Sequence, residues 1–308
     1  MLSVLLVYAV ETQANKYTSE FNPKYLDKII SEKPDLVLIG NSMLGYNVNE
    51  TVLEQKLANY CEREVNVVFI TSGGQMSAWW YLVLKNHVLP ANISKTPVGV
   101  FYRDRNILDP KLRTNGIYLT ALRESMKGDE TLYFEKTGIK MGGFPKFILQ
   151  RDEIKSKTVS YILKNTMETI SSGMNLPKDV EAVFSVEKFE KTVHDNEGVE
   201  HGICAKLSEC ADETLLPDMI DVMENNTLFF VQVHRNPEYE KITWRYEDEL
   251  REYFTKNNIP RIALHMEKQL NDSEAYYKHD HLTHEGILLN TEILAEKIVE
   301  LKVLNCNS

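Results

Sequence analysis

Apolar and polar positions alternate along the chain in blocks that predict strands separated by helices. Short, continuous apolar runs predict buried strands at 36–39, 65–70, 97–102, 227–234 and 260–265. Longer segments predict helices at 22–32, 50–61, 77–89, 239–257 and 286–301. Strands that are apolar throughout and alternate with helices are typical of a parallel sheet covered on both faces. We therefore expect an α/β fold, a three-layer sandwich with a central, mostly parallel, flavodoxin-like sheet.

Individual residues support two of these helices and indicate which side chains of a third are buried. Pro23 suits the first turn of a helix, where its missing N–H needs no partner. Asn49 is a suitable N-cap for the helix at 50–61. Trp79 and Trp80 lie within an apolar helical run, which favours a place in the core over an exposed platform for a sugar.

The middle of the chain, at about 107–220, interrupts the alternation of strands and helices. It contains a charged stretch at 149–170 that predicts a helix, followed by a polar, glycine-containing stretch. We interpret 107–220 as a largely helical insertion or cap over the sheet. Residues 22–308 are then one α/β domain that carries this insertion.

The first ten residues are apolar, but the run is too short to span a bilayer and lacks the features of a signal peptide. Residues 1–21 are either the trimmed end of an N-terminal membrane anchor or a strand or helix that packs on the domain. An anchor would associate the protein with a membrane and favours a location outside the cytoplasm.

Composition and charge restrict the kinds of binding partner and cofactor that can be expected. The chain has 308 residues and a formal net charge of −10, without a basic stripe, so nucleic acid is not an expected partner. It lacks both common glycine-rich nucleotide-binding loops, and we expect no cofactor and no metal. Cys204 and Cys210 could form a disulfide in an oxidising compartment, although free thiols are the default interpretation of the four cysteines.

Several notable residues follow the predicted strands, where open α/β sheets bind ligands. They are Ser42 after the first strand, Gly73 and Gly74 after the second, Arg103 to Asn106 after the third, His234 and Arg235 after the fourth, and His279 to His281 after the last. A serine hydroxyl becomes a nucleophile when a base, usually histidine, takes its proton. Backbone N–H groups at a glycine turn can then hold the oxyanion. Ser42, His281 and the Gly73–Gly74 turn could supply these three parts.

The order of these motifs resembles the SGNH (GDSL-like) hydrolases. Gly40-Asn41-Ser42 after a strand is similar to their first block, Gly73 or Gly74 to their second, and the histidine of "HLTHEG" at 281–286 to their last. The resemblance spans about 36–106 and 227–300. It implies an SGNH-type sheet, a Ser42 nucleophile, a His281 base, and oxyanion donors that include the Gly74 N–H.

The sequence departs from the family pattern in its third block and its triad acid. Arg103 stands roughly where the family has an asparagine, so Arg103, Asn106 or Asn86 could complete the oxyanion site or bind substrate. Lys278 occupies the position of the usual aspartate. The orienting group could be Asp280, another carboxylate or a backbone carbonyl, or a Ser–His dyad could act without one.

By this resemblance the protein is a serine esterase or O-acyltransferase. A small-molecule or carbohydrate ester is the expected substrate, with O-acetyl groups of a sugar or cell-envelope polymer preferred. The alternative is a catalytically degenerate SGNH fold that binds a glycan or a partner. Two metal hypotheses, a hydrolase using Asp104, His234 and Asp280 and a zinc site at His194, His201, Cys204 and Cys210, lack a convincing ligand pattern.

Overall fold

The computed structural model describes most of the α/β domain. The described residues are 21–93, 95–111, 113–114, 118–137, 206–224, 227–234, 236, 246–270, 272–277 and 281–306, without the side chains of 104, 105 and 119. The predictions for residues 1–20, for the helix at 149–170 and for 239–245 lie outside this part of the chain.

A single five-stranded sheet organises the described residues. Its strands are β1 (Leu36–Gly40), β2 (Val67–Thr71), β3 (Val98–Tyr102), β4 (Leu228–Gln232) and β5 (Arg261–Ala263). All neighbouring strands are parallel, in the order β2-β1-β3-β4-β5, which confirms the predicted sheet. From β1 the chain adds β2 on one side of the sheet and then adds β3, β4 and β5 on the other, so the strand order changes direction between β1 and β3. Ligands bind at such a switch point in open α/β sheets.

The helices that cover the sheet mostly lie where the sequence predicts them. They are α2 (Lys24–Glu32), α3 (Ser42–Asn47), α4 (Glu50–Cys61), α5 (Ser77–Val83), α6 (Tyr118–Ser125), α7 (Thr131–Thr137), α11 (Leu207–Cys210), α12 (Leu216–Val222), α13 (Glu247–Lys256) and α14 (His284–Glu300). The Asn49 side chain caps α4 as expected, accepting the Val52 N–H at 3.0 Å. The short helix α3, which begins at Ser42, is not among the helices expected from the sequence. The last strand is shorter than predicted, because a 3₁₀ turn, Leu264–Met266, follows β5 directly.

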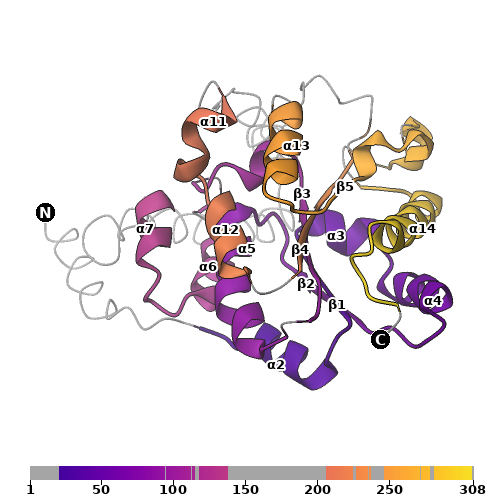
Figure 1. The fold of residues 1–308 in the computed structure, drawn as a ribbon, viewed down its shortest axis with the longest axis horizontal. Coiled ribbons are helices and arrows are strands. Elements are labelled where there is room, and N and C mark those ends of the chain that lie inside the picture. The colour runs from indigo at the N-terminus through magenta and orange to yellow at the C-terminus, as the bar shows by residue number, and fades with distance from the viewer. Residues whose placement is uncertain are drawn as a thin grey trace, which may run out of the picture.

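Helices cover both faces of the sheet, as in a three-layer sandwich (Figure 1). On one face, Leu36 and Leu38 of β1 share a buried cluster with α3, α4 and α14. On the other, Val37 and Ile39 share a buried cluster with α2, α5, α12 and α13. Side chains alternate between the two faces of a strand, so one strand contributes to two separate cores.

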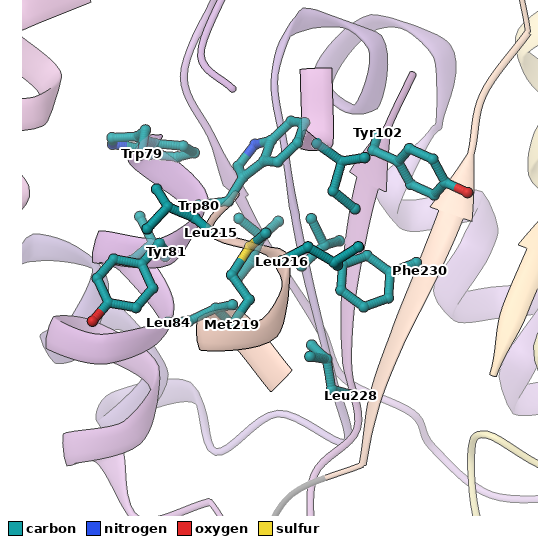
Figure 2. Close-up of a cluster of buried hydrophobic side chains, with 14 of the residues drawn as sticks. Trp79, Trp80, Tyr81, Leu84, Tyr102, Leu215, Leu216, Met219, Leu228 and Phe230 are labelled. Carbon is teal, nitrogen blue, oxygen red and sulfur yellow. The ribbon is translucent and has the colours of Figure 1, made fainter. Parts of the chain in front are cut away.

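Trp79 and Trp80 are fully buried in the second of these clusters, which confirms their predicted place in the core. Figure 2 shows both rings among the side chains of this cluster, which also include Met219 of α12 and Phe230 of β4. The Trp79 indole N–H donates to Ser125 Oγ at 3.1 Å, so the ring's one polar atom is satisfied inside the core.

The insertion is narrower than the predicted 107–220. Residues of α6, α7 and α12, including Leu122, Tyr133 and Leu216, are fully buried in the core cluster on the α5 side of the sheet. These helices belong to the covering layer, because their apolar faces pack towards the sheet. The long insertion lies between residues 138 and 205, outside the described part of the chain.

The default expectation of free thiols is wrong. A disulfide joins Cys61, at the end of α4, to Cys306, and Cys210 is disulfide-bonded too, to a partner outside the described residues. Cys61 and Cys306 are 245 positions apart, but their Cα atoms lie 4.4 Å apart because α4 and α14 pack side by side. No sequence motif signals this pair.

None of the helices in the described part of the chain is both long enough and apolar enough to cross a membrane.

Candidate functional site

Ser42 is the first residue of α3, immediately after β1, and its side chain is half-buried. Asn41 holds this turn in place from both sides. Its Oδ1 accepts the Met43 N–H at 3.0 Å, and its Nδ2 donates to the carbonyl oxygen of Gln75 at 3.1 Å. The asparagine of the Gly-Asn-Ser motif therefore ties the loop after β1 to the loop after β2.

The six-residue helix α3 has one buried side and one open side. Met43, Leu44 and Asn47 are buried, whereas Gly45 and Tyr46 are exposed and Ser42 is half-buried. Residues four apart lie on the same face of a helix. Ser42 and Tyr46 therefore project from the same open side, one helical turn apart.

The glycine turn after β2 lies beside this helix, and its two glycines differ. Gly74 has a positive φ of 67°, and a Cβ there would overlap the side chains of Tyr118 and Arg113. Gly73 is exposed and has no atom within 4 Å of the position that a Cβ would occupy. Only Gly74 is therefore required as glycine by both backbone and packing.

Two backbone N–H groups of the described residues, one at the start of α3 and one in the glycine turn, are free to donate to a ligand. Among the described residues, neither the Ser42 N–H nor the Gly74 N–H has a hydrogen-bond partner. The Ser72 N–H donates to the Gly40 carbonyl oxygen at 3.2 Å and so holds the ends of β1 and β2 together. A loop fixed in this way can present N–H groups to an oxyanion.

His281 comes to α3 from the other end of the chain. The neighbouring Leu282 N–H donates to Asn47 Oδ1 at 3.0 Å, and Asn290 Nδ2 donates to the Asn47 carbonyl oxygen at 2.7 Å. The His281 ring meets the Tyr46 ring edge to face, with centroids 5.3 Å apart. The structure thus places the His281 ring against Tyr46, which lies one helical turn from Ser42 on α3.

The hydrogen bonds of the described residues include none between Ser42 Oγ and the His281 ring. Catalytic hydrogen bonds are often long or poorly aligned before substrate binds. Lys278, His279 and Asp280 lie outside the described residues, and the choice of orienting acid stays a prediction.

The rest of the last motif has a structural explanation. Thr283 caps α14, accepting the Gly286 N–H at 3.3 Å. A Cβ on Gly286 would lie 2.5 Å from the Ala275 carbonyl oxygen, so only glycine fits. His284, at the first position of α14, is exposed, as expected for a surface residue.

Arg103 and Asn106, the two described side chains among the polar residues after β3, are buried. Arg103 is 8% exposed and Asn106 is 2% exposed, and the Asn106 N–H donates to the Arg103 carbonyl oxygen at 2.8 Å. Asn106 Oδ1 is buried without a partner among the described residues. Asn86 does not belong to this edge, because its amide donates to Ser125 and Glu130 within the helical layer.

A second polar cluster, not predicted from the sequence, lies at the ends of β3, β4 and β5. We call it the Glu247 network; it comprises Tyr102, Gln232, Glu247, Arg261 and His265. Arg261 donates to Glu247, Gln232 and Tyr102, and Gln232 Nε2 donates to Glu247 at 2.7 Å. Burial alone would raise the pKa of Glu247, but hydrogen bonds from His265, Arg261 and Gln232 lower that pKa to about 2.

His234, which follows β4, lies beside this network. It is 4% exposed, and neither ring nitrogen has a hydrogen-bond partner among the described residues. Burial, together with the nearby His265, lowers the pKa of His234 to about 3, so the ring is neutral at pH 7. The described residues contain no group of histidine, cysteine and carboxylate side chains that could hold a metal ion.

Comparison with known proteins adds no relative: no protein-family model matches the chain, and a search of curated proteins finds no match. Fold and geometry together show an α/β protein whose strand-end polar residues gather at the carboxyl edge of a parallel sheet.

Proposed function

We propose that this protein is an SGNH-type serine esterase or O-acyltransferase that acts on O-acetyl groups of a carbohydrate. The observation that carries the proposal is the position of His281. Its loop is hydrogen-bonded to the end of α3, the helix that begins at Ser42, although the two residues are about 240 positions apart. The strand order 2-1-3-4-5 is consistent with this class.

In the proposed reaction, His281 takes the proton of Ser42 as Oγ attacks the ester carbonyl. The C=O π bond breaks and leaves a tetrahedral oxyanion. The N–H groups of Ser42 and Gly74 are suited to hold this oxygen, because both lack a partner among the described residues. His281 then returns the proton to the departing alcohol oxygen, and an acyl-serine remains.

The second half of the reaction removes the acyl group. His281 takes a proton from water in a hydrolase, or from a sugar hydroxyl in a transferase, and the new oxygen attacks the acyl-serine. Ser42 leaves with the proton from His281. Arg103 and Asn106 are further oxyanion or substrate-binding candidates, and Asp280 is the candidate orienting acid.

Hydrolysis of p-nitrophenyl acetate and labelling with a fluorophosphonate probe test the nucleophile. We expect Ser42→Ala to abolish labelling and to lower kcat by about 10⁴-fold or more, because the attacking oxygen is removed. Ser72→Ala is the matched control, since Ser72 lies in the adjacent loop but has no proposed role. Equal activity of Ser42→Ala and wild type would contradict the proposal.

A second candidate function is a catalytically inactive SGNH-type fold that binds a glycan or a partner. The observation that favours it is the absence of a Ser42–His281 hydrogen bond among the described contacts. A folded wild type that neither labels nor hydrolyses esters, but still binds sugar, would select this alternative over the esterase.

A further inference from the structure

Two exposed tyrosines flank His281. Tyr46 is 62% exposed and Tyr277 is 58% exposed, and their rings lie 5.3 Å and 5.9 Å from the His281 ring, centroid to centroid. Tyr46 meets His281 edge to face, whereas Tyr277 lies nearly parallel to it. Aromatic surface that stays in water beside a candidate catalytic group indicates a binding surface.

Tyr277 is directed to this surface by the backbone. The preceding Tyr276 is 7% exposed, and its hydroxyl donates to the Leu270 carbonyl oxygen at 3.1 Å. Tyr276 pairs with Leu282 in an antiparallel bridge, and the Tyr277 N–H donates to the His281 carbonyl oxygen at 3.1 Å. Adjacent residues of an extended segment point to opposite sides, so burial of Tyr276 places Tyr277 outward.

Gly45 leaves the surface between Ser42 and Tyr46 open. It is exposed within α3, and a Cβ there would make only ordinary contacts, at 3.8 Å, with Thr71. Packing therefore does not require this glycine, although glycine within a helix costs about 1 kcal/mol relative to alanine. A larger side chain would project from the same open side of α3 as Ser42 and Tyr46.

We propose that Tyr46, Tyr277 and the open surface at Gly45 form a subsite for the pyranose ring that carries the ester. The inference rests on the proposed function and names the substrate's binding surface. The apolar C–H face of the sugar stacks on a tyrosine ring, and its acyloxy group extends along α3 towards Ser42.

Binding is measured by calorimetry in a Ser42→Ala background, so that the ester is not consumed. The probes are O-acetylated methyl hexopyranosides of the gluco, galacto and N-acetylglucosamine series, with an open-chain hexitol acetate as the ring-free comparison. We expect the best pyranoside to bind about tenfold more weakly to Tyr46→Ala and to Gly45→Gln. Tyr46→Phe keeps the ring and is expected to restore binding.

Tyr60→Ala is the matched control, because Tyr60 is 47% exposed on α4 and has no described ring contact. Pyranoside binding that Tyr60→Ala preserves and Tyr46→Ala weakens supports the subsite. Failure of every pyranoside to bind, or equal binding by Tyr46→Ala, overturns it.

Kinetics with Ser42 present separate this inference from the proposed function. We expect Tyr46→Ala to raise KM for the pyranoside and to reduce the preference for it over ethyl acetate. An equal loss on both esters would show that Tyr46 only positions His281, which overturns the subsite. Tyr46-dependent binding without any hydrolysis would retain the subsite and refute the esterase. Ser42-dependent hydrolysis of ethyl acetate without any pyranoside binding would support the esterase and refute the subsite.

Discussion

The two ends of the sheet's carboxyl edge use polar residues differently. Near β3 to β5, the polar atoms of the Glu247 network hydrogen-bond to one another and are largely buried. Near β1 and β2, the Ser42 and Gly74 N–H groups lack partners among the described residues, and the tyrosines beside His281 are exposed.

This difference separates structural polar residues from candidate functional ones. A polar residue near the end of a parallel strand is not functional by position alone, since Gln232 of β4 and Arg261 of β5 hydrogen-bond to Glu247 inside the fold. The end where two N–H donors lack partners among the described residues and two tyrosine rings stay exposed has the properties of a binding site. Each of the following experiments changes one end and compares it with the other.

The largest expected contrast comes from His281→Ala and Glu247→Gln. His281→Ala should lower kcat for ester hydrolysis by about 10³-fold or more and leave the melting temperature nearly unchanged. Glu247→Gln should cost about 3 kcal/mol of unfolding free energy, because it leaves the buried Arg261 without its counter-charge. Steady-state kinetics and thermal unfolding measure the two effects. A large melting-temperature loss in His281→Ala would assign that residue to the structure instead.

Acid should weaken the β3–β5 end over two pH ranges. The pKa of His234 falls from 6.5 to about 3 on folding, so its contribution is complete above pH 6.5 and declines as the pH falls towards 3. The pKa of Glu247 falls from 4.5 to about 2, so its contribution is complete above pH 4.5 and is lost towards pH 2.

Denaturant unfolding at pH 7, 5.5 and 4.5 tests the histidine part. The unfolding free energy should decrease by up to about 1.4 kcal/mol per pH unit for one such buried histidine. His234→Phe should flatten this slope, because it removes the titrating ring and keeps the site filled. Identical slopes for wild type and His234→Phe would mean that His234 does not titrate with folding.

The smallest expected effect distinguishes the two glycines at the open end. Gly74→Ala should lower the unfolding free energy by about 1–3 kcal/mol, since its positive φ and the side chains of Tyr118 and Arg113 leave no room for a methyl group. Gly73→Ala should change it by less than about 0.5 kcal/mol, because the position is open. Thermal melts of both variants measure the difference, and equal melting temperatures would contradict it.

The strands and helices could be predicted because burial is a local pattern. Apolar runs identify all five strands, and the Asn49 cap locates the start of α4. The short helix α3 is not predictable in this way, because Gly45 and an exposed Tyr46 give it little apolar periodicity. The contribution of α6, α7 and α12 to the core was not predicted from the sequence either. These helices flank a long polar insertion, and the sequence does not show where the core ends and the insertion begins.

Part of the candidate site is also predictable. The order of the Gly-Asn-Ser, glycine and His-Leu blocks along the chain is enough to propose Ser42, His281 and either Gly73 or Gly74 as site residues, and only the backbone of the fold distinguishes the two glycines. Tyr46 has one sequence signal, its spacing of four residues from Ser42, which becomes informative once the segment is known to be helical. Tyr277 has none, because its contact with His281 and its exposure depend on the antiparallel bridge between Tyr276 and Leu282.

By itself, the sequence determined the alternation of strands and helices, the parallel sheet and the motifs that follow its strands, because these depend on short-range patterns of burial and turn residues. Three contacts depend on the folded arrangement and not on local sequence pattern: the Cys61–Cys306 disulfide, the Arg261–Glu247 ion pair and the position of His281 against α3. Each of these contacts joins segments whose approach depends on the packing of whole helices against the sheet. The same packing decides which polar groups at the carboxyl edge are enclosed and which remain open to a ligand.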